Sequence, residues 1–152
     1  MNTLKKEAFY VVGISVRTTN ENGKAMQDIP ALWQRFMTEK VGDQLSNRIG
    51  EESYAVYTDY EKDHTKPYTM ILGYRVENLN DIPEGMIGSK IETANYKKFI
   101  AKGDLTKDAV VNEWMKIWNS DLQRTYSADF EVYGSKAQNP TDGEAEIFIA
   151  IE

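Results

Sequence analysis

The stretch ADFEVYG, residues 128–134, decides the fold of this chain. Its polar and apolar residues alternate and include β-branched and aromatic side chains, which is the pattern of a β-strand. In a strand, Phe130 and Val132 project from one face, whereas the side chains on the other face are those of Asp129, Glu131 and Tyr133. Burying a carboxylate in mid-strand among aromatic residues is costly unless a positive charge compensates it. We therefore expect Glu131 to line an aromatic cavity and to hold a cationic ligand there.

The sequence around this strand predicts a helix before it and a hairpin partner after it. Trp114 and Trp118 share the apolar stripe of a predicted helix. Downstream, the turn at Asp142-Gly143 leads into an apolar segment at residues 144–151, which we expect to pair with residues 129–134.

The same order of elements occurs earlier in the chain. The pattern predicts a first strand at residues 9–16 and a helix at 28–41 with Trp33 and Phe36 on its apolar face. A hairpin of strands 53–60 and 68–76 is predicted to follow. The short sequence YAVY at 54–57 resembles FEVY at 130–133, and each opens a hairpin after a tryptophan-bearing helix. A further strand, at residues 91–100, begins the second set. Repetition of this kind indicates an internal duplication, although a match this short is also compatible with coincidence.

The predicted fold is α+β. Two duplicated β-α-β-β halves of the SHS2-like type form an antiparallel sheet with two main helices and a pocket between the halves. The whole chain, residues 1–152, is expected to be a single domain with pseudo-repeats at about 7–78 and 86–152. On this alignment Glu131 stands where the first half has Ala55, and Tyr57 and Tyr133 face the same space as Glu131.

Several boundaries can also be predicted from single residues. Asp28 is expected to cap the first helix, with Pro30 in its first turn. Asp104 or Thr106 is expected to cap the second helix, and residues 1–6 are expected to be a frayed start.

Composition excludes several classes of function. The net charge is −6 and no basic cluster stands out, so nucleic-acid binding is not expected. The chain has no cysteine and no apolar run of membrane-spanning length, which favours a cytoplasmic protein without a membrane partner. The one histidine, His64, lies in a charged turn that matches no zinc or calcium motif, so no metal is expected. No phosphate loop, dinucleotide motif or nucleophile–base pair is found, and no cofactor is expected.

Motifs spread along the chain resemble one known family in their order and spacing. They are IPEGM at 82–86, then Ile91, Tyr96, Phe99 and Gly103, then Trp114 and Trp118, and finally FEVY at 130–133. Together they resemble the GyrI-like effector-binding domain of bacterial transcription activators, found at the C-terminal end of AraC-type and MerR-type regulators and as a standalone protein. The likeness is closer to the standalone cationic-drug-binding proteins of integron cassettes, and it covers nearly all of residues 7–152.

The resemblance implies a duplicated β-α-β-β domain that binds lipophilic cations through a buried glutamate ringed by aromatic side chains. The glutamate carries over to Glu131 and the tyrosine of the same strand to Tyr133. The aromatic residues of the family's helices carry over less directly, to Trp33, Phe36, Trp114 and Trp118. Strand direction adds three further residues to the expected site, namely Tyr57, Tyr96 and Phe148. Too few residues precede residue 7 for a DNA-binding domain, so transcriptional activation by this chain alone is not expected.

Other interpretations of Glu131 and of the pocket stay open at this point. Glu131 is alternatively a solvated edge-strand residue, or it pairs with Arg75 or Arg124. The pocket is alternatively that of a small hydrolase with Glu131 as general base. A third hypothesis is a gyrase-inhibitor-like module that acts through its exterior surface. The natural ligand, any protein partner and the oligomeric state are not defined by the sequence.

Overall fold

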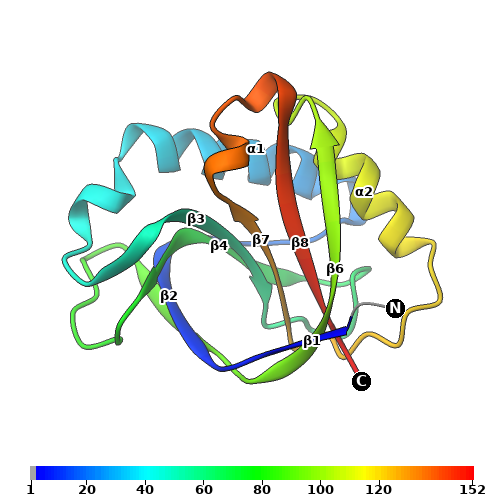
Figure 1. Ribbon diagram of the computed structural model, residues 1–152, viewed down its shortest axis with the longest axis horizontal. Helices are drawn as coiled ribbons and strands as arrows, with labels where there is room; N and C mark the ends of the chain where they lie inside the picture. The colour runs from blue at the N-terminus through cyan, green and yellow to red at the C-terminus, as the bar shows by residue number, and fades with distance from the viewer. Residues whose placement is uncertain (1–2) are drawn as a thin grey trace.

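The computed structural model describes residues 3–152 and contains one curled eight-stranded antiparallel sheet and two α-helices in that range (Figure 1). The strands are β1 (Thr3–Lys6), β2 (Phe9–Thr18), β3 (Arg48–Thr58), β4 (Tyr68–Val76), β5 (Ile87–Ile91), β6 (Ala94–Gly103), β7 (Ala128–Tyr133) and β8 (Gly143–Ile151). The helices are α1 (Lys24–Thr38) and α2 (Ala109–Trp118). The predicted α+β class is therefore confirmed.

The strand order β1-β6-β8-β7-β3-β4-β2-β5 places two β-α-β-β units back to back. β2, α1, β3 and β4 form one unit, β6, α2, β7 and β8 form the other, and β3 pairs with β7 where the units meet. Ala55 lies directly opposite Glu131 in that pairing. Because these two positions are also equivalent in the repeat, the approximate twofold axis passes between them.

The two outer strands cross over between the units. β1 precedes β2 in the chain but pairs with β6, and β5 precedes β6 but pairs with β2. The prediction of a frayed start was therefore wrong for residues 3–6, and residues 1–2 lie outside the described part. The single strand predicted at 91–100 is in fact β5 and β6, separated at Glu92 and Thr93. Both strands are completed by partners distant in sequence, so local alternation did not reveal them.

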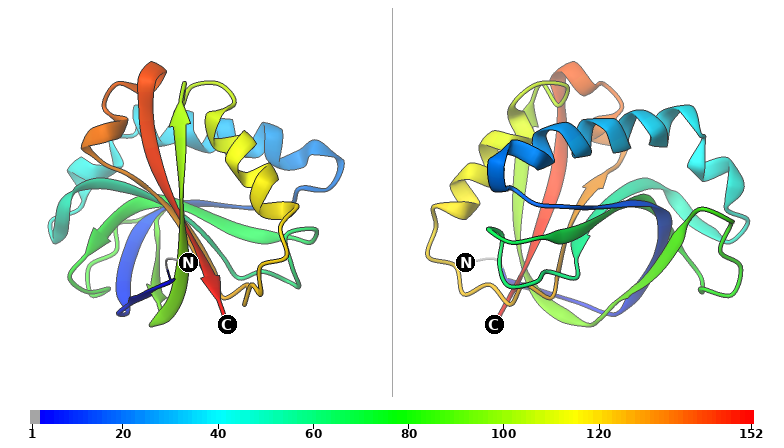
Figure 2. Two further views of the ribbon diagram at one scale, coloured as in Figure 1. Left: turned by 45° about the vertical axis from the view of Figure 1, so that its right-hand side comes forward. Right: turned by 180° about the vertical axis from the view of Figure 1, so that it is seen from behind.

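Both helices lie over one face of the sheet (Figure 2). Under them is a core to which α1 contributes Leu32 and Phe36 and α2 contributes Trp114 and Ile117. The opposite face carries a second apolar cluster made of strand residues, including Phe9, Tyr96, Phe130 and Phe148. Alternation along β7 therefore sends Glu131 toward the helices and Phe130 away from them.

The predicted helix boundaries needed correction. α1 begins at Lys24, after Gly23 with a φ of 70°, and Asp28 forms an ion pair with Lys24 instead of capping the helix. Pro30 lies inside α1 on its exposed side, where water can satisfy the carbonyl that loses its helical partner. Asp104 bonds Thr106 in a turn before α2, which itself starts after Asp108. Within residues 3–152 no helix is long and apolar enough to span a membrane.

Candidate functional site

Glu131 is the centre of a hydrogen-bonded cluster on the helix-covered face of the sheet. Its side chain is only 1% exposed, since β7 is one of the two central strands. Oε2 accepts hydrogen bonds from Tyr57 Oη at 2.9 Å and from Trp114 Nε1 at 2.6 Å. Oε1 accepts one from Tyr133 Oη at 2.6 Å. The three donors come from β3, α2 and β7, so the cluster joins both units of the fold.

The ionisation of Glu131 is set by two opposing effects. Burial removes the carboxylate from water and raises its pKa. The three hydrogen bonds lower the pKa, that from Tyr133 the most, but the pKa of Glu131 stays raised above its ordinary value because burial has the larger effect. The hydroxyls of Tyr57 and Tyr133 have pKa values well above 10 because they are buried beside this carboxylate, so both remain donors at neutral pH.

Glu131 has no cationic partner among the residues that the structure describes. The alternatives of a solvated edge residue and of a pair with a nearby arginine are both wrong. Arg124 pairs with Asp129 at 2.8 Å, and Arg75 lies over the ring of Phe9. A carboxylate held by three neutral donors still carries a full negative charge when it is ionised, so no charge within residues 3–152 compensates that of Glu131.

Three more of the predicted aromatic residues surround this cluster. Trp33 of α1 packs edge-on against Tyr133 with ring centroids 5.0 Å apart, and Phe36 packs against Trp33 at 5.7 Å. Trp118 lies 6.3 Å from Trp114. Trp33, Trp118 and Tyr133 are half-buried, so they form the outer part of the cluster.

The structure does not bring Tyr96 and Phe148 to Glu131. Both belong to the cluster on the opposite face, where their rings contact Phe130 at 5.2 and 4.9 Å. The reason is the registry of β8 with β7: Phe148 lies opposite Phe130, and Ile147 lies opposite Glu131. A shift of one residue in the assumed pairing exchanges the two faces of a strand.

Sequence analysis missed residues beside the cluster. Tyr68 of β4 packs against Tyr57 at 5.9 Å, and the alternation of Tyr68 with Met70 and Leu72 could have placed it on this face. His64, predicted in a solvated turn, is half-buried and stacks on Trp118 with ring centroids 5.9 Å apart. Burial and the charge of Arg124 lower the pKa of His64. In the described residues no cluster of acidic or histidine side chains is suited to a metal.

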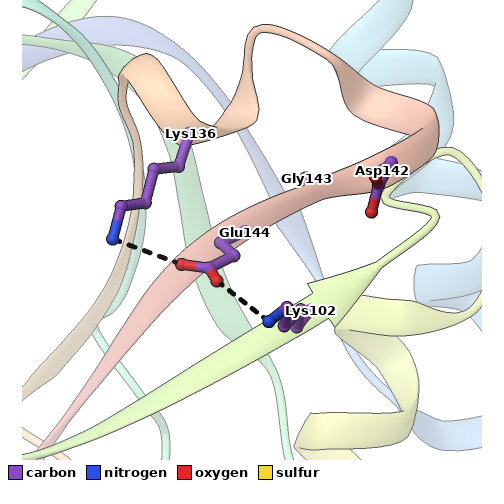
Figure 3. A pocket seen from close by; sticks show the side chains of 5 residues that line it. All are labelled: Lys102, Lys136, Asp142, Gly143 and Glu144. Carbon is purple, nitrogen blue, oxygen red and sulfur yellow. Dashed lines mark ion pairs between the residues drawn. The ribbon is translucent and has the colours of Figure 1, made fainter.

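Aromatic rings from both units surround Glu131, and an open ligand cavity between the units stays a prediction. A shallow pocket of about 210 Å³ lies elsewhere, at the end of β6 and the start of β8 (Figure 3). Its polar lining is occupied by ion pairs from Glu144 to Lys102 and Lys136, both at 3.6 Å. It offers no apolar surface comparable to that around Glu131.

The fold and this buried carboxylate define the class of effector-binding domains, and the comparisons with known proteins agree. The sequence matches the family described as "Cass2: Integron-associated effector binding protein" over residues 4–151. The chain therefore belongs to the Cass2 family, which confirms the resemblance identified from the motifs.

Individual relatives share nearly the whole chain. YobU of Bacillus subtilis (strain 168), which is named as a transcriptional regulator, is 28% identical over 144 residues, covering 92% of this chain and 90% of YobU. The solved integron cassette protein VCH_CASS2 of Vibrio cholerae is 26% identical, with a TM-score of 0.77, and the match covers 99% of this chain and 95% of that one. SAV2435, solved bound to tetraphenylphosphonium, has a TM-score of 0.81 at 18% identity, covering 99% and 93% of the two chains, and shows the shared fold.

Proposed function

We propose that this protein binds hydrophobic cationic small molecules at Glu131, acting as a standalone sensor, sequestering protein or regulatory ligand-binding module rather than as an enzyme. The observation that carries the proposal is a buried carboxylate whose three partners are all neutral: Tyr57, Trp114 and Tyr133. A positive charge next to Glu131 would replace the hydration that burial removes. Membership of an effector-binding family and the tetraphenylphosphonium complex of SAV2435 support this ligand class.

The residues around Glu131 favour hydrophobic cations with delocalised charge over small hydrated cations. Each aromatic face in contact with a cation adds roughly 0.5–2 kcal/mol. The apolar body of the ligand adds about 25 cal/mol for each Å² that it buries. A compact ammonium ion has little apolar surface to bury and loses its own hydration, so it binds weakly.

Entry of the ligand requires the outer rings to move. Trp33 and Tyr133 are the half-buried residues that pack on each other above Glu131, and side-chain rotation there costs less than in the core. The cation then takes the place of the ring contact between Trp33 and Tyr133. Tyr57 and Trp114, which are buried, keep the carboxylate in position.

Tetraphenylphosphonium is the probe for the test, and the emission of the three tryptophans is the readout, because all of them lie on α1 or α2 near the site. Glu131→Gln keeps the shape of the side chain and removes its charge. We expect its affinity to fall at least about thirtyfold, since truncating a buried charge pair costs about 2 kcal/mol or more. Glu39→Gln, which removes an exposed charge, is the matched control.

A neutral ligand separates charge recognition from apolar contact. Triphenylphosphine oxide has similar rings without a net charge, and we expect it to bind weakly and equally to the wild type and to Glu131→Gln. Equal affinity of the two proteins for tetraphenylphosphonium would exclude the proposed site.

A further inference from the structure

A second pocket lies on the face of the sheet opposite Glu131. Its volume is about 660 Å³, within the usual range of small-molecule sites. The lining comes from β1, β2, β3, β4, β7 and β8 and includes Phe9, Tyr54, Phe130 and Phe148. The cation site proposed above uses none of these residues.

The floor of this pocket is a continuous set of aromatic rings. Phe130 stacks on Phe148 with centroids 4.9 Å apart and meets Phe9 edge-on at 5.2 Å. Tyr54 extends the floor, at 5.8 Å from Phe9. Phe9, Phe130 and Phe148 are each at most 6% exposed, whereas Tyr54 is half-buried. The three phenylalanine rings are thus covered by neighbouring side chains, and a flat apolar molecule reaches them when Lys6 and Arg75 move aside.

Two cationic side chains lie over opposite ends of this floor. Lys6 Nζ is 4.4 Å from the centroid of the Phe148 ring, and the guanidinium carbon of Arg75 is 5.2 Å from that of Phe9. Among the ion pairs of residues 3–152, neither side chain has a carboxylate partner within 4.0 Å. Neither charge is therefore neutralised by an ion pair, although Arg75 interacts with Tyr54 as well as with Phe9.

The acidic residues of the rim are placed differently. Glu146 already forms an ion pair with Lys98 at 2.6 Å. Glu7 is exposed and Glu52 half-buried, and Lys5 on the rim adds a third positive charge. The charges that lie over the phenylalanine rings are thus positive and Glu146 is paired, while Glu7 and Glu52 also line the pocket.

We propose that this pocket binds small amphipathic organic anions. Their flat apolar body lies on the rings of Phe9, Phe130 and Phe148, and their carboxylate or sulfonate group pairs with Lys6 or Arg75. The chain then has two sites of opposite charge preference, one on each face of the sheet.

The test uses 1-anilinonaphthalene-8-sulfonate, a flat aromatic anion whose emission rises in apolar surroundings. We expect Lys6→Gln/Arg75→Gln to bind it at least tenfold more weakly than the wild type. Lys6→Arg/Arg75→Lys, which keeps both charges, should bind within about threefold of the wild type. The matched control Lys62→Gln/Lys90→Gln removes two exposed positive charges away from the pocket and should bind as the wild type does.

Two further measurements separate this site from the one at Glu131. Glu131→Gln should bind the dye normally, and tetraphenylphosphonium should not displace it from the wild type. Far-UV circular dichroism and unfolding midpoints must match for all variants, which excludes dye binding to a loosened fold. Equal dye affinity of the wild type and Lys6→Gln/Arg75→Gln would overturn the proposal, as would displacement of the dye by organic cations but not by laurate.

Discussion

Strand β7 carries two buried carboxylates only two residues apart, and their surroundings differ in one respect. Asp129 is 0% exposed and Glu131 is 1% exposed. Asp129 accepts hydrogen bonds from Arg124 at 2.8 Å, from Tyr60 at 2.6 Å and from the Ala150 amide at 2.8 Å. Glu131 also has three donors, but all of them are neutral. The first carboxylate has a cation built into the fold, and the second does not.

This difference is the reason for proposing a structural role for Asp129 and a binding role for Glu131. The charge of Asp129 is neutralised inside the protein, and the hydrogen bond that its side-chain Oδ1 accepts from the Ala150 amide ties β7 to β8. The charge of Glu131 is left without a partner at a place where aromatic rings from both helices converge. Burial on its own therefore does not distinguish the two carboxylates, and the missing counter-charge is what makes Glu131 the candidate for ligand binding.

The largest effect should come from breaking the internal pair. Arg124→Met keeps much of the apolar volume but leaves Asp129 buried without a cation. We expect the free energy of unfolding to fall by about 3–5 kcal/mol, the range for removing one member of a buried ion pair. Urea unfolding followed by circular dichroism measures it. Arg35→Met, which breaks the exposed pair with Glu39, should cost no more than about 1 kcal/mol, and a similarly small loss for Arg124→Met would show that the buried pair is not structural.

The second effect concerns the pH dependence of cation binding. Only the ionised form of Glu131 attracts a cation, so affinity should rise with pH up to the pKa of Glu131 and be constant above it. Because burial raises this pKa, the decline on acidification should begin at a higher pH than for an ordinary glutamate. Well below the pKa, affinity for tetraphenylphosphonium should fall about tenfold for each pH unit. Titrations from pH 4.5 to 8 measure this, and Glu131→Gln should give a flat profile.

The third effect is on stability and has the opposite sign from that of Arg124→Met. A raised pKa means that the folded state retains its proton at a pH where the unfolded state has lost it. Stability from this group therefore decreases as pH rises through the folded-state pKa. Glutamine does not ionise, so the Glu131→Gln variant does not lose stability in this way as the pH rises. At pH 7 the variant should therefore be as stable as the wild type, or more stable by about 1 kcal/mol. This value is the low end of the cost of burying an isolated polar group. A marked destabilisation in urea unfolding at pH 7 would mean that Glu131 supports the fold.

The part of the site that lies on one strand could be predicted from the sequence. The FEVY motif identified Glu131 and Tyr133, and the match with YAVY placed Tyr57 beside them, because the strands that carry both motifs pair at the approximate twofold axis. The two hairpins and the stripes of both helices were also evident from periodicity alone.

Features that depend on distant partners could not be predicted in the same way. The faces of Tyr96 and Phe148 depend on the registry of three strands, which no local pattern specifies. The exchange of β1 and β5 between the units and the pairing of Arg124 with Asp129 are likewise properties of the assembled sheet. Alternation placed Asp129 on the same face as Glu131, but it gave no means of deciding which of the two carboxylates has an internal cation.

The smallest effect tests a single neutral donor. Tyr57→Phe keeps the ring at the site but removes the 2.9 Å hydrogen bond to Glu131, which helps to keep its pKa down. We expect little change in tetraphenylphosphonium affinity above the pKa of Glu131, where the carboxylate is ionised in either protein. Below that pKa the variant should bind about threefold more weakly, which corresponds to the lower end of the range for one hydrogen bond. Tyr68→Phe is the matched control, because its ring packs on Tyr57 while its hydroxyl bonds to Asn20, and it should follow the wild-type profile. Identical profiles for Tyr57→Phe and Tyr68→Phe would show that Trp114 and Tyr133 alone set the charge of Glu131, and that the donor contributed by the first half of the fold is dispensable.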